Sequence, residues 1–324
     1  MDVSVVIPTY NRASLLPHTL RAVLAQSLPP REIIVVDDGS TDETPRVLAD
    51  FDRRVQVITI VNSGSIVARN VGLHAARGAF IAFCDSDDLW RPAFLARMAA
   101  LWQAEPTTLF GYANFQIVSN GEWLAGSKFD EMPPAFWTGL RDLGDGLGVF
   151  DEPIVRRLLN WQPFFPSALV AERSAFVACG GWDEGVGRTV GDDFGTVLRL
   201  GEMHPFGVVR APLVGIRKHA GNFSASTRAT NLGDANILEY VLASRPSLAV
   251  HADAIREGVA QRRRAALNGA FADEDFVAVR AIYKELQPRE ILNGLRLKKL
   301  VATLPFPLAS RVAKLGSWVR SLLR

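Results

Sequence analysis

The segment GAFIAFCDSDDLW, residues 78–90, passes from an apolar run into three aspartates, Asp85, Asp87 and Asp88. An apolar run without polar alternation is typical of a strand that is buried on both faces, as in a parallel sheet covered by helices. Carboxylates this close together repel one another unless a cation lies among them. The segment therefore predicts a buried strand whose carboxyl end leads into a cation-binding loop.

Further strands and helices alternate with this one over the first hundred residues. Apolar runs rich in β-branched residues predict buried strands at 3–8 (VSVVIP), 32–38 (EIIVVDD), 55–60 (VQVITI) and 79–84 (AFIAFC). Helical periodicity separates them, from Ser14 to Leu24, up to Leu48, from Ser65 to Ala76 and after Pro92. Strands separated by helices of this length predict βαβ units and a mostly parallel, Rossmann-like α/β sheet flanked by helices.

The pattern changes in the second part of the chain. Residues 109–118 predict a strand, whereas the Gly-, Pro- and aromatic-rich stretch 128–150 has no clear period and predicts a functional or mobile loop. Shorter helices and strands follow, and the chain is helical in pattern after about Asn231. We therefore expect a domain over residues 1–230, with halves 1–108 and 109–230, and a helical C-terminal extension over 231–324.

Composition excludes several classes of protein. A length of 324 residues fits one large α/β domain with an appendage, and a net charge of +2 argues against a nucleic-acid partner. Cys84 and Cys179 are the two cysteines and form no CxxC pair, which indicates a reducing compartment. The N-terminus does not have the pattern of a signal peptide, and no apolar run approaches the roughly 18–20 residues of a membrane span. We expect a cytoplasmic protein, or one attached to a membrane from that side.

Polar residues follow the predicted strands, where ligands bind in open parallel sheets. The first βα turn, IPTYNRAS, lacks GxGxxG, and the chain has no GxxxxGK[ST], which excludes an ordinary dinucleotide fold and a P-loop. Asp38 can accept hydrogen bonds from a base or ribose, and Asp85 from a ribose. Asp87 can bind a divalent cation together with a diphosphate. The alternative is that the acidic cluster only caps the helix that begins near Pro92.

The chain resembles the family-2 glycosyltransferases, which have the GT-A fold. The resemblance lies in VSVVIPTYNR, EIIVVDDGSTDET, NSGSIVARNVGLHAARGAFIAFCDSDD, GGWDE, DDFGTVLRL and KHAGNFSAS, which occur in the family's order over about the first 230 residues. It implies a nucleotide-diphosphate sugar, with a UDP-sugar as the first candidate, bound by residues 1–108, and an acceptor bound by residues 109–230. Uracil, thymine and guanine remain open as the base.

The resemblance also implies roles for individual residues. DSD is the family's DxD motif, which binds Mn²⁺ or Mg²⁺ through Asp87, and His219 matches a histidine near the metal. Asp193 corresponds to the family's catalytic base, with Asp192 as the alternative. Residues expected to contact the donor are Pro8, Thr9, Tyr10, Asp38, Arg69, Asp85 and Ser86.

For the acceptor we expect contacts from Trp161, Trp182 and Asp183. Trp161 belongs to an aromatic group that can stack on sugar faces, with Phe136, Trp137, Phe150, Phe164 and Phe165, although such residues can equally be core residues. Trp182 lies in GGWDE and would cap the acceptor cleft, with Asp183 nearby.

One carboxylate base and no candidate nucleophile beneath the sugar suggest a single displacement with inversion. The QxxRW motif of processive synthases is absent, which favours the addition of one sugar to a glycan or lipid-linked acceptor in cell-surface polysaccharide or glycoconjugate synthesis. Two alternatives stay open. A sugar nucleotidyltransferase would need a glycine-rich loop that IPTYNRAS does not provide, and a catalytically decayed binding or scaffold protein is disfavoured by the intact Asp38, Asp87 and Asp193.

The C-terminal tail is basic and amphipathic. From Arg289 onward it has eight basic residues and one acid, Glu290. Apolar residues recur at helical spacing, with Trp318 at the edge of the stripe formed by Leu308, Val312, Leu315, Val319, Leu322 and Leu323. This pattern predicts a helix that lies on an anionic membrane surface. The alternative is that the stripe packs on the protein itself or on a second copy in a homodimer.

Overall fold

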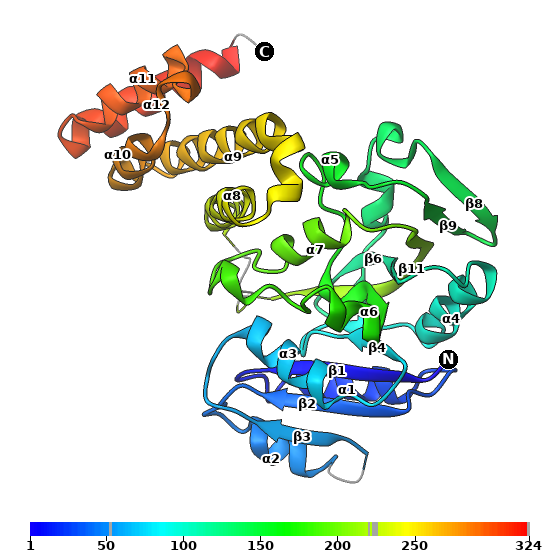
Figure 1. Ribbon diagram of the computed structural model, residues 1–324. Helices are drawn as coiled ribbons and strands as arrows, with labels where there is room; N and C mark the ends of the chain where they lie inside the picture. The colour runs from blue at the N-terminus through cyan, green and yellow to red at the C-terminus, as the bar shows by residue number, and fades with distance from the viewer. Residues whose placement is uncertain (52–53, 220, 222–225, 323–324) are drawn as a thin grey trace. The chain divides into compact units, whose positions relative to one another are not determined.

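The computed structural model describes residues 1–51, 54–219, 221 and 226–322, apart from the side chains of 289 and 316–322 (Figure 1). Contacts divide the chain into two compact units. The first is Met1–Arg188 with Asp193–Ala220, and the second is Thr189–Asp192 with Gly221–Arg324. The sequence prediction had placed the end of the first domain at residue 230.

The first unit is built on a single mixed sheet. Among the described residues eleven strands join it in the order β3-β2-β1-β4-β10-β6-β11-β9-β8, with β5 on β11 and β7 on β6. The strands are β1 Val3–Thr9, β2 Glu32–Asp37, β3 Gln56–Thr59, β4 Phe80–Phe83, β5 Leu89–Trp90, β6 Phe110–Ser119, β7 Glu122–Trp123, β8 Leu140–Gly144, β9 Leu147–Phe150, β10 Leu169–Glu172 and β11 Phe206–Lys218. The helices of this unit are α1 Leu16–Leu24, α2 Thr44–Ala49, α3 Ser65–Ala75, α4 Phe94–Ala104, α5 Val155–Leu158, α6 Arg173–Ala178 and α7 Phe194–Leu200.

The N-terminal half of the sheet confirms the predicted βαβ pattern. Strands β3, β2, β1 and β4 are parallel neighbours, and every residue of β1 is buried. Helix α3 packs on β1 and β2, and Gly72 permits the close approach because a Cβ there would overlap the side chain of Val6. Parallel pairing brings the carboxyl ends of β1, β2 and β4 to the same edge of the sheet.

The antiparallel pairings lie in the second half of the sheet and bring distant segments to this edge. Strand β10 runs antiparallel between β4 and β6. Strand β5, directly after the three aspartates, pairs Leu89 and Trp90 with Gly215 and Val214 of β11. The residues at the end of β11 are thereby brought alongside the DSD loop.

The stretch 128–150 differs from the prediction of an irregular loop. It contains two 3₁₀ turns, Lys128–Glu131 and Pro134–Trp137, and then the antiparallel hairpin β8–β9. Asp145 and Gly146 form the turn with φ of 53° and 70°, as Asp-Gly does in tight hairpins. The sequence held this Asp-Gly signal, but the flanking strands are too short to show a clear period.

The second unit is helical. Its helices are α8 Thr227–Ser244, α9 Ala252–Ala272, α10 Phe276–Glu285, α11 Asn293–Ala302 and α12 Phe306–Leu322, with 3₁₀ turns at Pro246–His251 and Pro288–Glu290. Asp275 caps α10 by accepting a hydrogen bond from the Ala278 N–H, and it pairs with Arg228 of α8 at 2.8 Å. A separate apolar core joins α9 to α12. Within the described residues, no helix has the length and apolar character that crossing a membrane requires.

Candidate active site

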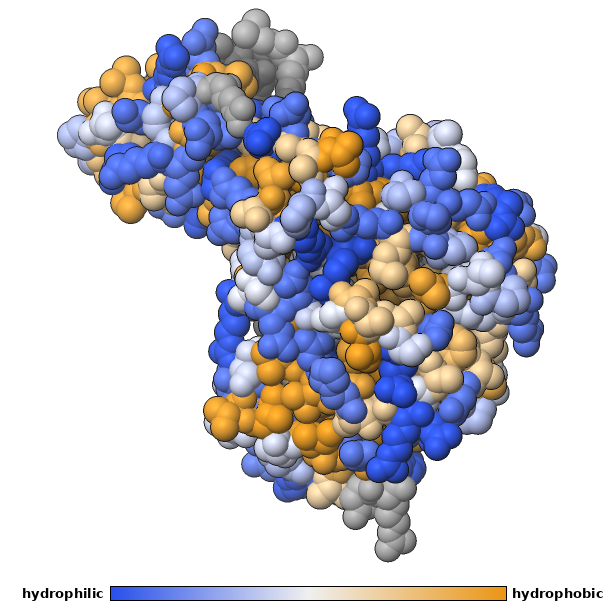
Figure 2. Space-filling model, viewed as in Figure 1, coloured by the Kyte–Doolittle hydropathy of each residue, from blue (hydrophilic) through white to orange (hydrophobic). Residues whose placement is uncertain are grey.

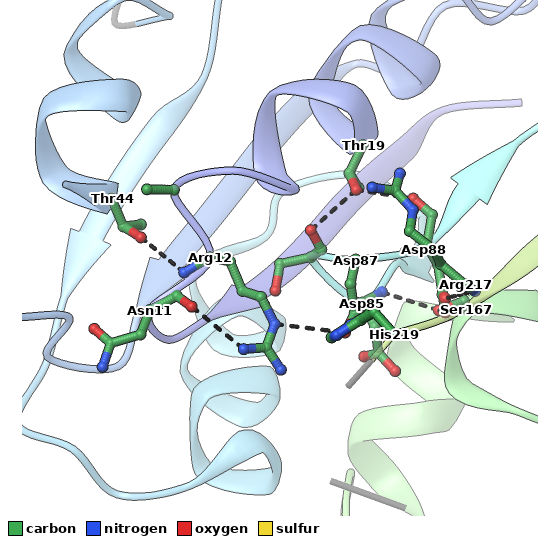
Figure 3. A network of polar contacts seen from close by, with 12 residues as sticks. Asn11, Arg12, Thr19, Thr44, Asp85, Asp87, Asp88, Ser167, Arg217 and His219 are labelled. Atoms are coloured by element: carbon green, nitrogen blue, oxygen red, sulfur yellow. Dashed lines mark hydrogen bonds and ion pairs between the residues drawn. The ribbon is translucent and has the colours of Figure 1, made fainter. Parts of the chain in front are cut away.

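The turn after β1 is tied to the turn after β2. Asn11 has a positive φ of 51°, and its side-chain oxygen accepts a hydrogen bond from the Thr41 N–H at 2.8 Å. The Arg12 N–H donates to the hydroxyl of Thr44 at 2.9 Å. With the backbone fixed in this way, the Arg12 side chain extends toward the DSD loop (Figure 3).

Asp38 lies buried at the end of β2 and organises the loop before α3. Its two carboxylate oxygens accept hydrogen bonds from the N–H groups of Ser63 at 2.6 Å and Gly64 at 2.8 Å. Each carboxylate oxygen has a second lone pair available for a ligand. Asp38 therefore has a structural task at this edge, and its contact with a nucleotide stays a prediction.

The DSD loop after β4 lies beside two arginines and a histidine. Asp85 pairs with Arg69 of α3 at 2.5 Å. Oδ2 of Asp87 lies 3.4 Å from Nε of Arg12 and 2.9 Å from Nε2 of His219 (Figure 3). His219 is 132 residues away in sequence and reaches Asp87 because β11 pairs with β5.

Asp88 is buried beneath this loop and holds three segments together. Its carboxylate accepts hydrogen bonds from the Arg217 N–H at 3.0 Å and from the Ser167 hydroxyl at 2.5 Å. Ser167 in turn accepts the N–H of Asp85 at 2.9 Å. Burial raises the pKa of Asp88 well above its usual range, and the charges of Asp87 and Asp85 act in the same direction. Each aspartate thus has its own partners, and sequence reasoning had not assigned a role to Asp88 or Ser167.

The side chains at the loop are compatible with a divalent cation. In the part of the chain that the structure describes, no three His, Cys, Asp or Glu side chains are grouped as a metal site. The Asp87–His219 pair offers one carboxylate and one imidazole, and Asp85 adds a half-buried carboxylate that pairs with Arg69. Such a set suits Mn²⁺ or Mg²⁺ if a diphosphate provides further oxygens. Residues 220 and 222–225 of KHAGNFSAS lie outside the described residues.

Asp193 precedes the first residue of α7 and belongs to the same unit as the DSD loop. Its carbonyl accepts the Val197 N–H at 3.0 Å. Burial raises the pKa of Tyr112 well above its usual range, and the charge of Asp193 adds to the rise. Asp193 and Tyr112 are therefore electrostatic neighbours. Asp192, the alternative base, is the last residue of the segment Thr189–Asp192, which belongs to the second unit.

Three polar atoms near these groups are buried without a hydrogen-bond partner among the described residues. They are Oγ1 of Thr9, the hydroxyl of Tyr112 and Nε1 of Trp182. Buried polar atoms without partners are rare in folded proteins and call for a bound ligand or water. Thr9 was among the expected donor contacts. Tyr112 was missed because it lies within an apolar strand pattern.

The expected acceptor residues do not form one surface. Trp182 is fully buried, packs edge-on against Phe83 with ring centroids 5.0 Å apart, and lies under the guanidinium of Arg69. It therefore supports Arg69 and does not present a stacking face. Trp161 is half-buried beside Phe136. Asp183 accepts the Gly185 N–H at 3.1 Å.

A cavity of about 370 Å³ lies next to Trp182 and Asp183 and is also lined by Asn70, His74 and Arg199. Trp161 is not among its lining residues. Of the other predicted aromatic residues, Phe136, Phe150 and Phe164 are core residues, packed together around the hairpin.

The sheet and the site at its edge define a GT-A glycosyltransferase fold. Staphylococcus aureus TarS 1–349 in complex with UDP-GlcNAc is similar to this chain with a TM-score of 0.60 and 18% identity, over 93% of this chain and 87% of that one. The complex of the same protein with UDP is similar with a TM-score of 0.60 and 19% identity, over 90% of this chain and 82% of that one. Residues 4–154 match the model of glycosyl transferase family 2.

Curated relatives agree with the family. A glycosyltransferase named for teichuronic acid biosynthesis, TuaG of Bacillus subtilis (strain 168), is 37% identical over 36% of this chain and 48% of its own length. The Escherichia coli UDP-Glc:alpha-D-GlcNAc-diphosphoundecaprenol beta-1,3-glucosyltransferase WfgD is 34% identical over 39% of this chain and 52% of its own length. The succinoglycan biosynthesis protein ExoO of Rhizobium meliloti (strain 1021) is 44% identical over 30% of this chain and 28% of its own length. The chain spans about half or less of the length of these relatives.

Proposed function

We propose that this protein is a metal-dependent, inverting glycosyltransferase that moves one sugar from a nucleotide-diphosphate sugar to a hydroxyl of a glycan or lipid-linked acceptor. The observation that carries the proposal is the meeting of Arg12, the DSD loop and His219 at the carboxyl edge of the sheet. The similarity in fold to a protein crystallised with UDP-GlcNAc supports a UDP-sugar as the donor.

The donor half has groups for each part of a nucleotide sugar. Tyr10 is 43% exposed at the end of β1 and can stack on a base. Asp38 and Thr9 can contact the nucleoside, since the buried hydroxyl of Thr9 has no hydrogen-bond partner in the described part of the chain. Asp85 and Ser86 would contact the ribose, and Arg69 can donate N–H groups to the diphosphate.

Asp87 and His219 would hold the cation. A bound Mn²⁺ or Mg²⁺ would neutralise the charge that develops on the diphosphate leaving group. Arg12 and Arg69 are fixed positive charges close to Asp87 and Asp85, and they favour a diphosphate at this edge whether or not a metal is bound.

Asp193 would act as the general base. The acceptor oxygen forms the new bond to the anomeric carbon, its proton passes to the carboxylate of Asp193, and the bond from that carbon to the diphosphate breaks. One displacement inverts the anomeric configuration. Asp192 remains the alternative base.

The names of the relatives suggest an acceptor class. WfgD is named for a diphosphoundecaprenol acceptor and TuaG for teichuronic acid biosynthesis. We extend these to a role in bacterial cell-surface polysaccharide or glycoconjugate synthesis, with a lipid-linked acceptor reached at the inner face of the cell membrane. The cavity beside Trp182 and Asp183 is a candidate for part of the acceptor site.

The test is a panel of UDP-, GDP- and dTDP-sugars scored by nucleotide release with Mn²⁺, with Mg²⁺ and with excess chelator. We expect release from one donor, in metal only. Asp87→Ala should abolish it, and Asp253→Ala should not, because the Asp253 side chain is fully exposed on α9.

Full activity in chelator would contradict the metal assignment. Pyrophosphate production from a nucleoside triphosphate and a sugar phosphate would indicate a nucleotidyltransferase. No turnover or binding of any nucleotide sugar would refute the proposed function.

A further inference from the structure

Helices α11 and α12 leave several of their large apolar residues facing away from the core of the second unit. The core contains Leu295, Val301 and Ala302 of α11, and Ala309 of α12. The small residue Ala309 is fully buried, whereas Leu308 beside it is 49% exposed. In an ordinary amphipathic helix the larger apolar side chains face the core, so this arrangement indicates a second apolar contact outside the unit.

The outward residues form a regular pattern. Leu297 and Leu300 lie three residues apart on α11, each 63% exposed, and Leu308, Val312 and Leu315 recur at helical spacing on α12. We name the outer α11–α12 surface after its exposed apolar members, which are Leu297, Leu300, Phe306, Leu308, Val312 and Leu315. Figure 2 shows hydrophobic side chains mixed with hydrophilic ones over the end of the chain that contains these helices.

The charged residues of α11 and α12 themselves have a single sign. Residues 291–324 contain seven Lys and Arg and no Asp or Glu. Arg296 and Arg311 are exposed, and Lys314 is exposed although it lies 3.2 Å from Glu274. A second copy of the chain would bring basic residues against basic residues. An anionic surface with an apolar interior would attract the basic side chains and would also bury the exposed leucines.

We propose that the outer α11–α12 surface docks on an anionic lipid bilayer, with its apolar side chains at the acyl boundary and its basic side chains at the headgroups. The proposal rests on the proposed function in one respect, since docking on the bilayer would hold the enzyme where a lipid-linked acceptor is found. The rest of the stripe predicted from the sequence, Trp318, Val319, Leu322 and Leu323, lies outside the described side chains.

The test is sedimentation of the full chain with phosphatidylglycerol vesicles, and with phosphatidylcholine vesicles as the neutral comparison, in the absence of donor. Leu300→Asn with Leu315→Asn should weaken binding at least tenfold at low and high salt. Val250→Asn, at an 81% exposed apolar residue in the same unit, should leave binding unchanged. All three side chains are exposed, so the fold should persist, which thermal melts would verify.

Charge variants test the electrostatic contribution to vesicle binding. Arg296→Gln with Arg311→Gln should weaken binding to phosphatidylglycerol about 25-fold at low salt, about fivefold per charge, and much less at high salt. Arg256→Gln on α9, where Arg256 pairs with Asp253, is the control.

Equal partition of the wild-type protein and the leucine variant onto vesicles would overturn the proposal. A dimer that the leucine variant dissociates, without vesicle binding by the wild type, would overturn it in favour of a homodimer interface. Because no donor is present, failure here leaves the transferase proposal standing, and loss of nucleotide release does not affect this result.

Discussion

At the residue scale, the site depends on how three adjacent aspartates are separated by their partners. Asp85 is held by Arg69, Asp87 by Arg12 and His219, and Asp88 by the Ser167 hydroxyl and the Arg217 N–H. Two of the three therefore keep a cation beside them, and the third is buried in hydrogen bonds. This arrangement keeps the DSD loop ordered at the edge of the sheet.

The choice of base can be tested at the same scale. Asp193→Asn keeps the size of the side chain but removes the proton acceptor, so transfer should fall by roughly 10²–10⁴ while the dissociation constant of the donor stays unchanged. Asp192→Asn is the matched control and should retain most of the rate. If Asp192→Asn is inactive and Asp193→Asn transfers at a near wild-type rate, the base is Asp192.

At the element scale, α8 holds the segment that leads into Asp193. A Cβ at Gly233 of α8 would overlap the carbonyl oxygen of Val190. Gly191 has a φ of 80° and lies against Asp234, which pairs with Arg262 of α9 at 3.2 Å. Residues 189–192 thus belong to the helical unit by their contacts, although the next residue is the candidate base.

Gly233→Ala tests this dependence. The added methyl group must displace Val190, so we expect transfer to fall at least tenfold with little change in the binding of the donor. Gly269→Ala on α9 is the control because a Cβ there meets no atom within 4 Å, and it should raise helix stability slightly. Unchanged transfer in Gly233→Ala would show that the position of the segment does not limit the rate.

At the scale of the whole molecule, the two units have separate apolar cores, and the residues proposed to bind the donor lie in the first. A ligand that binds one folded unit stabilises that unit by about 2.7 kcal/mol at 100 times its dissociation constant. With UDP-sugar and Mn²⁺, we expect amide hydrogen exchange to slow in β1, β4 and β11 and to stay unchanged in α9. Equal slowing in α9 would mean that the chain opens as a single cooperative body.

Truncation of the tail is a poor test of membrane docking for a structural reason. A chain cut before Leu304 would lose Ala309, which belongs to the core of α9–α12, and would expose Ala302. Substitutions on the outer α11–α12 surface avoid this damage because the altered side chains are already exposed.

The sequence by itself determined the parts of this protein that depend on neighbouring residues. The apolar runs of β1, β2 and β4 predicted buried parallel strands, because strand and helix periods are local properties. The motifs around Asp38 and DSD predicted a donor half for the same reason, since each is a contiguous string at the end of one strand. The alternation also predicted a mostly parallel sheet, and the resemblance to the family implied the GT-A fold, which the similarity to TarS supports.

Only the tertiary structure decided which distant segments meet. The pairing of β5 with β11 brings His219 to Asp87 across 132 residues, and no local pattern encodes that partner. Trp182 was expected to cap the acceptor cleft, and the structure buries it beneath Arg69, since burial depends on what packs from other elements. The tail follows the same rule: its stripe was visible in the sequence, but only packing decided that Ala309 faces the core while Leu308 and Leu315 face outward.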